Sequence, residues 1–218
     1  MSEQAKGNSP AKLGAALNAV HNVAVFNRRV EVLVRHLAEM IPIGGRVLDL
    51  GCGDGSIALA LMGKRPDLSL EGVDVLLRPD PHIPVTLFDG HRLPFDDKSF
   101  DYVTIVDVLH HTDDPVELVG EAARVARRGV VIKDHRLKGV AAGATLRFMD
   151  YVGNRGHGVR LPYNYLDDAR WEKLFQSTGC TVVQRLDRLG IYPGPFSLLF
   201  DRQLHFMALL YPDGAGMA

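Results

Sequence analysis

Three glycines at alternate positions, Gly51, Gly53 and Gly55, follow an apolar segment that carries one acidic residue, Asp49. Glycine lets the main chain turn sharply and approach a ligand without a side chain in the way. This spacing is typical of a place where a small nucleoside-like ligand lies against bare backbone. Residues 47–55 therefore predict a cofactor site.

Further acidic residues lie at the ends of the next apolar, strand-like segments: Asp74, Asp89 and Asp107. The separation between the glycine turn and Asp74 is about that of the ribose-binding acid in a Rossmann-type βαβ unit. In such units the carboxylate accepts hydrogen bonds from sugar hydroxyls. We therefore expect Asp74 to anchor a ribose.

Histidines follow two neighbouring strand-like segments, in the pairs His110-His111 and Asp134-His135. Ligands bind at the carboxyl ends of strands in open α/β sheets, where an imidazole can accept a proton from a reacting group. We take His111 and His135 as candidate catalytic bases; the alternative is that these histidines only pack or contact a ligand. A metal cluster with Asp107 is not expected, because histidine is a poor magnesium ligand and adjacent strand residues point to opposite faces.

The rest of the chain supplies the elements that must position these residues. Apolar residues at helical spacing predict a helical region over 13–41. Further helices are expected at 56–64, 115–128, 142–151 and 167–177, and strands at 46–50, 68–75, 85–89, 102–109, 129–133, 180–187 and 205–211. This alternation of strands and helices predicts an α/β fold with a parallel sheet covered on both faces.

Composition excludes several classes of function. The formal net charge is −1 with 23% charged residues, so the chain lacks the basic field of a protein that binds long nucleic acids. The two cysteines, Cys52 and Cys180, fit a reduced intracellular protein. Residues 1–10 lack the apolar core of a signal peptide and no later run has the length of a membrane span, so we expect a cytoplasmic location.

Together, these motifs resemble the class I S-adenosylmethionine-dependent methyltransferases, and specifically their small-molecule branch, which includes the ubiquinone and menaquinone methyltransferases. The resemblance covers residues 44–135 closely, with the later elements following the same order more loosely. It implies methyl transfer from S-adenosylmethionine to a small-molecule acceptor, with S-adenosylhomocysteine as the other product. An in-line nucleophile held about 3 Å from the methyl group is the main requirement, and a base is needed only when the acceptor must lose a proton.

The resemblance also implies which residues contact the cofactor. The turn over 51–53 would lie under the methionine and ribose portions, Asp49 would position the amino group, and Asp107 and Val108 would line the methionine end. Asp74 would hold both ribose hydroxyls. The full expected set is Asp49, Gly51, Cys52, Gly53, Asp74, Val75, Asp89, Gly90, Asp107 and Val108.

The adenine side departs from the family pattern. Asp89 and the backbone at Gly90 are where the family recognises the adenine amino group. Most relatives carry a helix after the ribose-binding acid, whereas residues 76–84 contain three prolines, which cannot form a helix interior. We expect a loop there, so the adenine-side wall beside Val75 would differ from that of the family.

The resemblance sets the expected organisation of the chain. We predict one Rossmann-like, doubly wound domain over 11–212 whose seven-stranded sheet is mostly parallel with an antiparallel last strand. Residues 11–43 would form an N-terminal helical cap and 136–165 an acceptor-side insertion, with disordered ends at 1–10 and 213–218. The glycines of 147–158 suggest a movable cover, and the aromatic residues of 190–196 would wall an apolar acceptor pocket or serve core or dimer packing.

Two other functions stay open at this point. Gly53, Gly55 and Ala58 also satisfy the looser nicotinamide pattern G-x-G-x-x-A, so an NAD(P)-dependent oxidoreductase is one alternative. A catalytically silent relative that binds the cofactor and acts through a partner is another. We expect Arg28 and Arg29 to be solvated charges, as is usual on an amphipathic helix, and the alternative is that they reach the methionine carboxylate or an acidic acceptor. We expect a monomer or homodimer.

Overall fold

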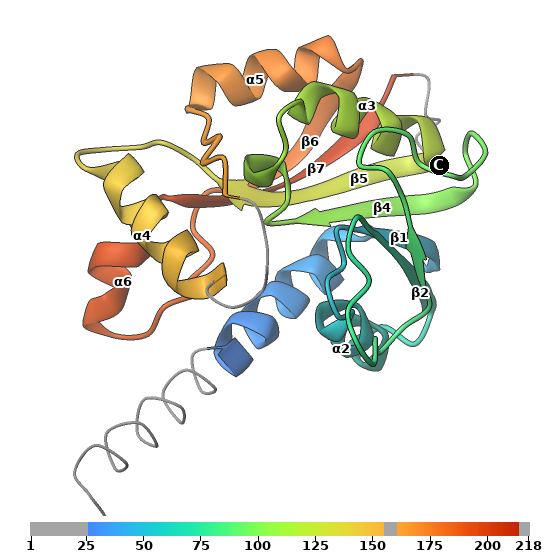
Figure 1. The fold of residues 1–218 in the computed structure, drawn as a ribbon, viewed down its shortest axis with the longest axis horizontal. Helices are drawn as coiled ribbons and strands as arrows, with labels where there is room; N and C mark the ends of the chain where they lie inside the picture. Colours follow the sequence, from blue (N-terminus) through green and yellow to red (C-terminus); the bar gives the residue numbers. More distant parts are fainter. Residues whose placement is uncertain (1–25, 155–160, 214–218) are drawn as a thin grey trace, which may run out of the picture.

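The computed structural model describes residues 26–154 and 161–213. Its centre is one seven-stranded sheet in the order β3-β2-β1-β4-β5-β7-β6 (Figure 1). The strands are β1 Gly45–Leu50, β2 Leu68–Asp74, β3 Val85–Leu87, β4 Phe100–Val106, β5 Ala126–His135, β6 Cys180–Leu186 and β7 His205–Pro212. β7 pairs antiparallel with both β5 and β6, and the other pairs are parallel. The predicted mostly parallel sheet with an antiparallel last strand is confirmed.

Helices cover both faces of this sheet. The described part of the N-terminal helix spans 26–40, and the later helices are α2 Ser56–Lys64, η1 Leu109–His111, α3 Pro115–Val125, α4 Ala142–Asn154, α5 Asp168–Ser177 and α6 Pro195–Phe200. α3 and α5 pack on one face, and the N-terminal helix and α2 pack on the other (Figure 1). α4 and α6 lie together at one end of the sheet.

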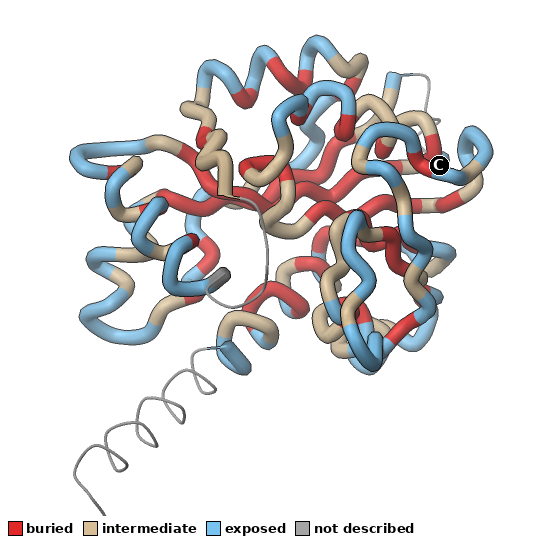
Figure 2. The backbone as a smooth tube through the Cα atoms, viewed as in Figure 1, coloured by how far each residue is buried: buried red, intermediate tan, exposed pale blue. Residues whose placement is uncertain are grey.

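The buried residues form two main cores, one on each face of the sheet. One contains Trp171 and Phe175 of α5, and the other contains Leu33 and Leu37 of the N-terminal helix. Figure 2 shows burial concentrated along the strands and exposure on the outer surfaces of the helices. Apolar residues at helical spacing explain these contacts, because they place one stripe of each helix against the sheet.

Several element boundaries differ from the prediction for local reasons. The strand predicted to reach residue 109 ends at Val106, because Asp107 adopts a left-handed conformation with φ 58° and a short 3-10 helix follows. The helix predicted to reach 128 ends at Val125, because Ala126 already pairs with Phe100 of β4. The chain there extends into the sheet instead of continuing the helix.

Other boundaries confirm or extend the prediction. The proline-rich segment 76–84 contains no helix, as expected. α4 runs three residues beyond the predicted 142–151, and α6 was not predicted. The expected disordered end at 1–10, all but the first residue of the expected disordered end at 213–218, the first half of the helical cap and part of the expected movable cover fall outside the described residues. Within the described parts of the chain, no helix has the length and hydropathy needed to cross a membrane.

Candidate functional site

A cavity of about 890 Å³ opens at the carboxyl ends of β1, β4 and β5. One side is the backbone of the glycine turn, and the other is formed by α4 and the loop that leads into α6. Its polar lining includes Asp107, His110, His111, Lys133, His135 and His205. Its apolar lining includes Phe26, Ile57, Val106, Phe148, Met149, Val152, Ile191, Tyr192, Phe196 and Phe200.

The glycine turn has the conformation that its sequence requires. Gly51 and Gly53 have φ values of 73° and 60°, which side-chain-bearing residues rarely adopt. A Cβ atom on Gly51 would lie 2.4 Å from Cγ2 of Val108, whereas a Cβ on Gly53 would meet no atom within 4 Å. Gly53 therefore leaves open space beside bare backbone in the cavity wall, and the turn fits a ligand that packs against the main chain.

Asp49 is buried near the end of β1, just before this turn. The hydroxyl of Thr104 donates a hydrogen bond to its Oδ1 at 2.8 Å. Burial raises the pKa of Asp49 to about 7, against the lowering effect of that hydrogen bond. A carboxyl group with this pKa changes charge near neutral pH, so its ionisation is sensitive to a cation placed beside it.

Asp74 ties the glycine turn to the end of β2. Its two carboxylate oxygens accept hydrogen bonds from the backbone N–H groups of Gly53 and Leu76, each at 2.9 Å. Val75 is half-exposed, and its Cγ1 lies 3.3 Å from the position of a Cβ on Gly90. The structure thus brings the expected ribose and adenine residues to one rim, outside the enclosed part of the cavity.

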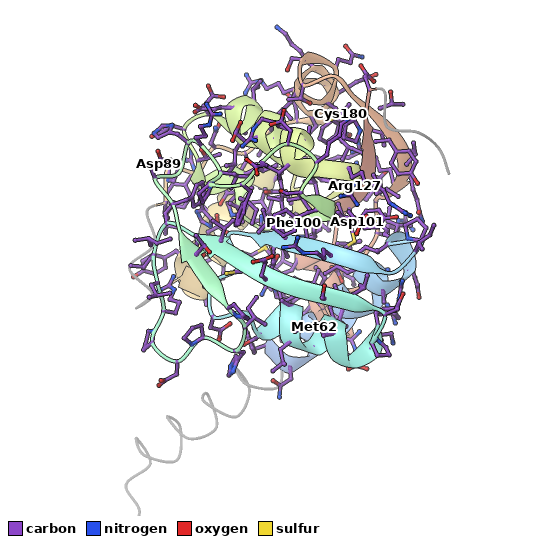
Figure 3. All side chains as sticks on the ribbon, turned by 90° about the vertical axis from the view of Figure 1, so that its right-hand side faces the viewer. Met62, Asp89, Phe100, Asp101, Arg127 and Cys180 are labelled. Atoms are coloured by element: carbon purple, nitrogen blue, oxygen red, sulfur yellow. The ribbon has the colours of Figure 1, made fainter. Side chains whose placement is uncertain are left out.

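Asp89 is exposed and caps a turn beyond β3. Its Oδ1 accepts hydrogen bonds from the N–H groups of His91 and Arg92, and these bonds lower its pKa. Figure 3 shows it near the carboxyl ends of β2 and β3, far from the Arg127–Asp101 ion pair, whose residues lie at the amino ends of β5 and β4. Asp89 therefore belongs to the same edge of the sheet as Asp74.

Asp107 is the residue on which two cationic side chains meet. Its Oδ2 accepts a hydrogen bond from Nη2 of Arg29 at 2.6 Å, and its Oδ1 accepts one from Nζ of Lys133. Burial alone would raise its pKa, but Lys133, His135 and Arg29 hold the pKa well below the usual range. The interpretation of Arg29 as a solvated charge is wrong, because its guanidinium reaches from the N-terminal helix into the site.

His110 lies between two carboxylates. Its Nδ1 is 2.6 Å from Oδ1 of Asp134, and its Nε2 is 3.3 Å from Oδ2 of Asp150. Burial would lower its pKa, but the two carboxylates raise it to about 10. The hydroxyl of Tyr165 donates a further hydrogen bond to Asp150. An imidazolium at His110 therefore joins η1, β5 and α4, and it neutralises part of the buried negative charge.

The two predicted bases lie in the cavity lining beside this group. His135 is 6% exposed, and its pKa is lowered by burial and by the charge of Lys133. The pKa of His111 is also lowered, by burial and by His110, and its Nδ1 has no hydrogen-bond partner among the described residues. Both imidazoles are therefore neutral near pH 7 and competent to accept a proton.

His205 and Lys133 complete the polar floor. Nε2 of His205 lies 3.0 Å from the carbonyl oxygen of Phe200, to which it donates in the neutral form. Its Nδ1 is then free to accept from Nζ of Lys133, 3.4 Å away. Burial lowers the pKa of Lys133, and burial together with Lys133 holds the pKa of His205 well below its usual value.

The same groups offer ligand atoms to a metal ion. One atom from each of Asp107, His110, Asp134 and His135 lies within 4.8 Å of the others. However, His110 and Asp134 already bond to each other at 2.6 Å, and the Lys133 ammonium contacts Asp107. These two cations already neutralise the carboxylates that a metal ion would bind. The geometry therefore favours a hydrogen-bonded network over a metal site.

The sequence analysis missed four members of this network: Lys133, Asp150, Tyr165 and His205. Lys133 directly follows the apolar run from Val130 to Ile132. A lysine near the end of a buried strand is rarely buried without a partner, and this signal could have identified Lys133 as a site residue. Asp150 and Tyr165 carry no comparable local signal. Their roles arise only because α4 folds back over η1.

Comparison with known proteins identifies the family. Residues 22–185 match the family model described as a methyltransferase domain, which is more than half of the chain. The 27-O-demethylrifamycin SV methyltransferase of Amycolatopsis mediterranei is 32% identical over 112 residues, covering 44% of this chain and 41% of that protein. The chain spans half or less of the length of the first curated relatives that it matches.

Solved structures show the same fold at low identity. A Pyrococcus horikoshii protein, PH0226, has a TM-score of 0.62 at 20% identity, covering 86% of this chain and 91% of that one. The magnesium protoporphyrin IX methyltransferase of Synechocystis PCC 6803, solved with bound SAH, has a TM-score of 0.56 at 17% identity, covering 87% and 84%. The chain belongs to the methyltransferase domain family.

Proposed function

We propose that this enzyme transfers a methyl group from S-adenosylmethionine to a small-molecule acceptor that binds between α4, α6 and the N-terminal helix. The observation that carries the proposal is the two-sided cavity, with bare backbone at Gly53 on one side and apolar side chains around His135 on the other. Its volume of about 890 Å³ lies in the upper part of the range of ligand pockets, about 300–1,000 Å³. That size suits the reactive end of a cofactor together with a small acceptor.

The proposed cofactor contacts follow the rim of the glycine turn. Bound S-adenosylmethionine supplies an electrophilic methyl group on a positively charged sulfur. Asp74 would accept hydrogen bonds from the ribose hydroxyls, and ionised Asp49 would favour the ammonium group. Asp89, Gly90 and Val75 would recognise the adenine. Gly51, Cys52, Gly53, Asp107 and Val108 would surround the methionine and ribose portions.

On the acceptor side, we assign the role of general base to His135. Its Nδ1 lies 3.6 Å from Oδ1 of Asp107 and 3.7 Å from Oδ1 of Asp134, which favour the ring proton at Nδ1, and no described residue hydrogen-bonds its Nε2. A neutral imidazole in this position would take a proton from an acceptor hydroxyl or amine at Nε2 as the nucleophile attacks. His111 is the second candidate base. The ammonium of Lys133 helps to keep His135 neutral, which is the state that a base requires.

The alternatives are less well supported. The dehydrogenase alternative gives no role to the buried groups around His110. A silent relative has no need of a base beside an open cavity. We also propose a cytoplasmic location, because Cys52 and Cys180 are both unpaired thiols.

Transfer from S-adenosylmethionine labelled in its methyl group tests the proposal. Label is expected in the small-molecule fraction of a cell extract, and the His135→Gln variant is expected to lose transfer while it still binds the cofactor. Label found only in RNA or protein would overturn the small-molecule proposal. Cofactor binding with no transfer to any fraction would favour the silent relative.

A further inference from the structure

Large apolar side chains gather on the outer surface of α4 and α6, beside the mouth of the cavity. α4 and α6 are neighbours at the same end of the sheet (Figure 1), and Nη2 of Arg202 bridges toward α4 through Oγ1 of Thr145 at 3.3 Å. We call this surface the apolar face. It consists of Val140, Phe148, Tyr151, Val152, Phe196, Leu198 and Leu199, all of which are about half-exposed or more.

A small acceptor explains only part of the apolar face. Phe148, Val152 and Phe196 line the cavity, so an acceptor in the cavity would contact them. Leu198 and Val140 do not line it, yet they are 76% and 87% exposed. α6 is almost entirely apolar and has no buried residue. Exposed apolar side chains on two neighbouring helices indicate an interaction with something larger than the pocket's own ligand.

The charges beside the apolar face indicate what that larger partner is. Arg147 on α4 and Arg202 after α6 are exposed. The carboxylates of the same segments point inward: Asp150 pairs with His110, and Asp201 accepts hydrogen bonds from the N–H groups of the loop before α6. Protruding apolar side chains flanked by arginines fit the interface of an anionic lipid layer.

We propose that the apolar face docks on the surface of an anionic membrane. Leu198, Leu199 and Val140 would enter the headgroup region, while Arg147 and Arg202 contact lipid phosphates. The cavity opens beside this face, so an amphipathic acceptor would pass from the lipid to His135 without crossing water. This last step rests on the proposed methyl transfer, whereas the docking itself does not.

Co-sedimentation with vesicles tests the docking directly. Vesicles of phosphatidylcholine with phosphatidylglycerol are compared with vesicles of phosphatidylcholine alone, at low and high salt and without cofactor. The wild-type protein is expected to bind the anionic vesicles and to be released by salt, because surface charges are screened. The double variant Leu198→Ser/Leu199→Ser is expected to bind at least about tenfold more weakly, because neither side chain can then be buried in lipid as leucine is.

Matched controls separate docking from folding and from methyl transfer. Leu59→Ser removes a half-exposed leucine from α2, away from the apolar face, and Arg127→Gln removes an exposed arginine at the amino end of β5. Both are expected to bind vesicles like the wild type, and Arg147→Gln/Arg202→Gln is expected to lose the preference for anionic lipid. Each variant is also titrated with S-adenosylmethionine. A loss of cofactor binding would count against the proposed function and not against membrane docking.

Three results would overturn the docking proposal. The first is a wild-type protein that ignores anionic vesicles. The second is a Leu198→Ser/Leu199→Ser variant that binds them as tightly as the wild type. The third is a dimer in sedimentation velocity that this double variant converts to monomer, because the face would then be covered by a second copy of the chain.

Discussion

The two sides of the cavity are built in different ways. The side proposed to bind the cofactor, called the cofactor side, uses backbone conformation and short carboxylates, as when Asp74 accepts a hydrogen bond from the N–H group of Gly53. The side proposed to bind the acceptor, called the acceptor side, uses buried ionisable side chains from separate elements, with His110 between Asp134 and Asp150. The first side depends on local geometry and the second on electrostatic balance, so substitutions on the two sides should affect different measurements.

The largest effect is expected on the acceptor side. His135→Gln should reduce methyl transfer by about a hundredfold to ten-thousandfold, the usual contribution of a general base, while affinity for S-adenosylmethionine stays unchanged. The pKa of His135 lies below the ordinary value of 6.5, so the wild-type rate should stay constant down to pH 6.5 and fall only at lower pH. Labelled transfer and calorimetry measure the two quantities.

His91→Gln is the control for this variant, because His91 is an exposed histidine outside the cavity. Equal transfer by His135→Gln and wild type would exclude His135 as the base and leave His111 as the candidate. A parallel loss of cofactor affinity would mean that His135 serves binding.

The next effect is on stability. His110→Gln should lower the free energy of unfolding by about 3–5 kcal/mol, because it leaves the buried carboxylates of Asp134 and Asp150 without their charge partner. The folded-state pKa of His110 is raised from 6.5 to about 10, so its stabilisation is fully present below pH 6.5 and is lost as the pH rises to about 10. Urea unfolding across this pH range should show the wild-type and variant stabilities converging; a constant difference would contradict the assigned charge.

On the cofactor side, the pH dependence of binding should follow Asp49. With a pKa of about 7, Asp49 is largely protonated at pH 6, so affinity for S-adenosylmethionine should be about fivefold weaker at pH 6 than at pH 7. Asp49→Asn should bind more weakly and lose this dependence. A raised carboxyl pKa also means that folding stability falls as the pH rises from 3.8 to about 7, and the asparagine variant should not show that fall.

The smallest effect is expected at the contact between the two sides. Arg29→Gln removes one partner of Asp107, but the arginine side chain is partly exposed and Lys133 remains. The loss of unfolding free energy should therefore be about 1 kcal/mol or less. A loss as large as that of His110→Gln in the same urea experiment would show that Lys133 alone does not balance the charge of Asp107.

The comparison also explains what the sequence could predict. The start of α3 followed from adjacent residues, because Asp114 accepts hydrogen bonds from the N–H groups of Val116 and Glu117 beside Pro115. The end of β4 did not, because the apolar pattern continues to Leu109 while the chain turns at Asp107. Likewise, α6 has only six residues between a glycine and a charged turn, too few for a periodic signal.

The candidate site divides in the same way. The glycine turn and Asp74 were predicted because spacing along one βαβ unit determines how they meet. The partners of the acceptor side are distant in the chain: Arg29 and Asp107 are 78 positions apart, and Lys133 and His205 are 72 apart. Only the packing of the whole domain brings such pairs together, so composition and spacing carried no signal for them.

The most direct test of the cofactor side is calorimetric titration of S-adenosylmethionine and NADH into the wild type and the Asp74→Ala variant. The wild type should bind S-adenosylmethionine and not NADH, and Asp74→Ala should weaken that binding by about 1–3 kcal/mol, the cost of leaving ribose hydroxyls unpaired. Asp96→Ala, which removes an exposed carboxylate outside the cavity, should bind like the wild type. Binding of NADH alone, or unchanged affinity in Asp74→Ala, would contradict the account.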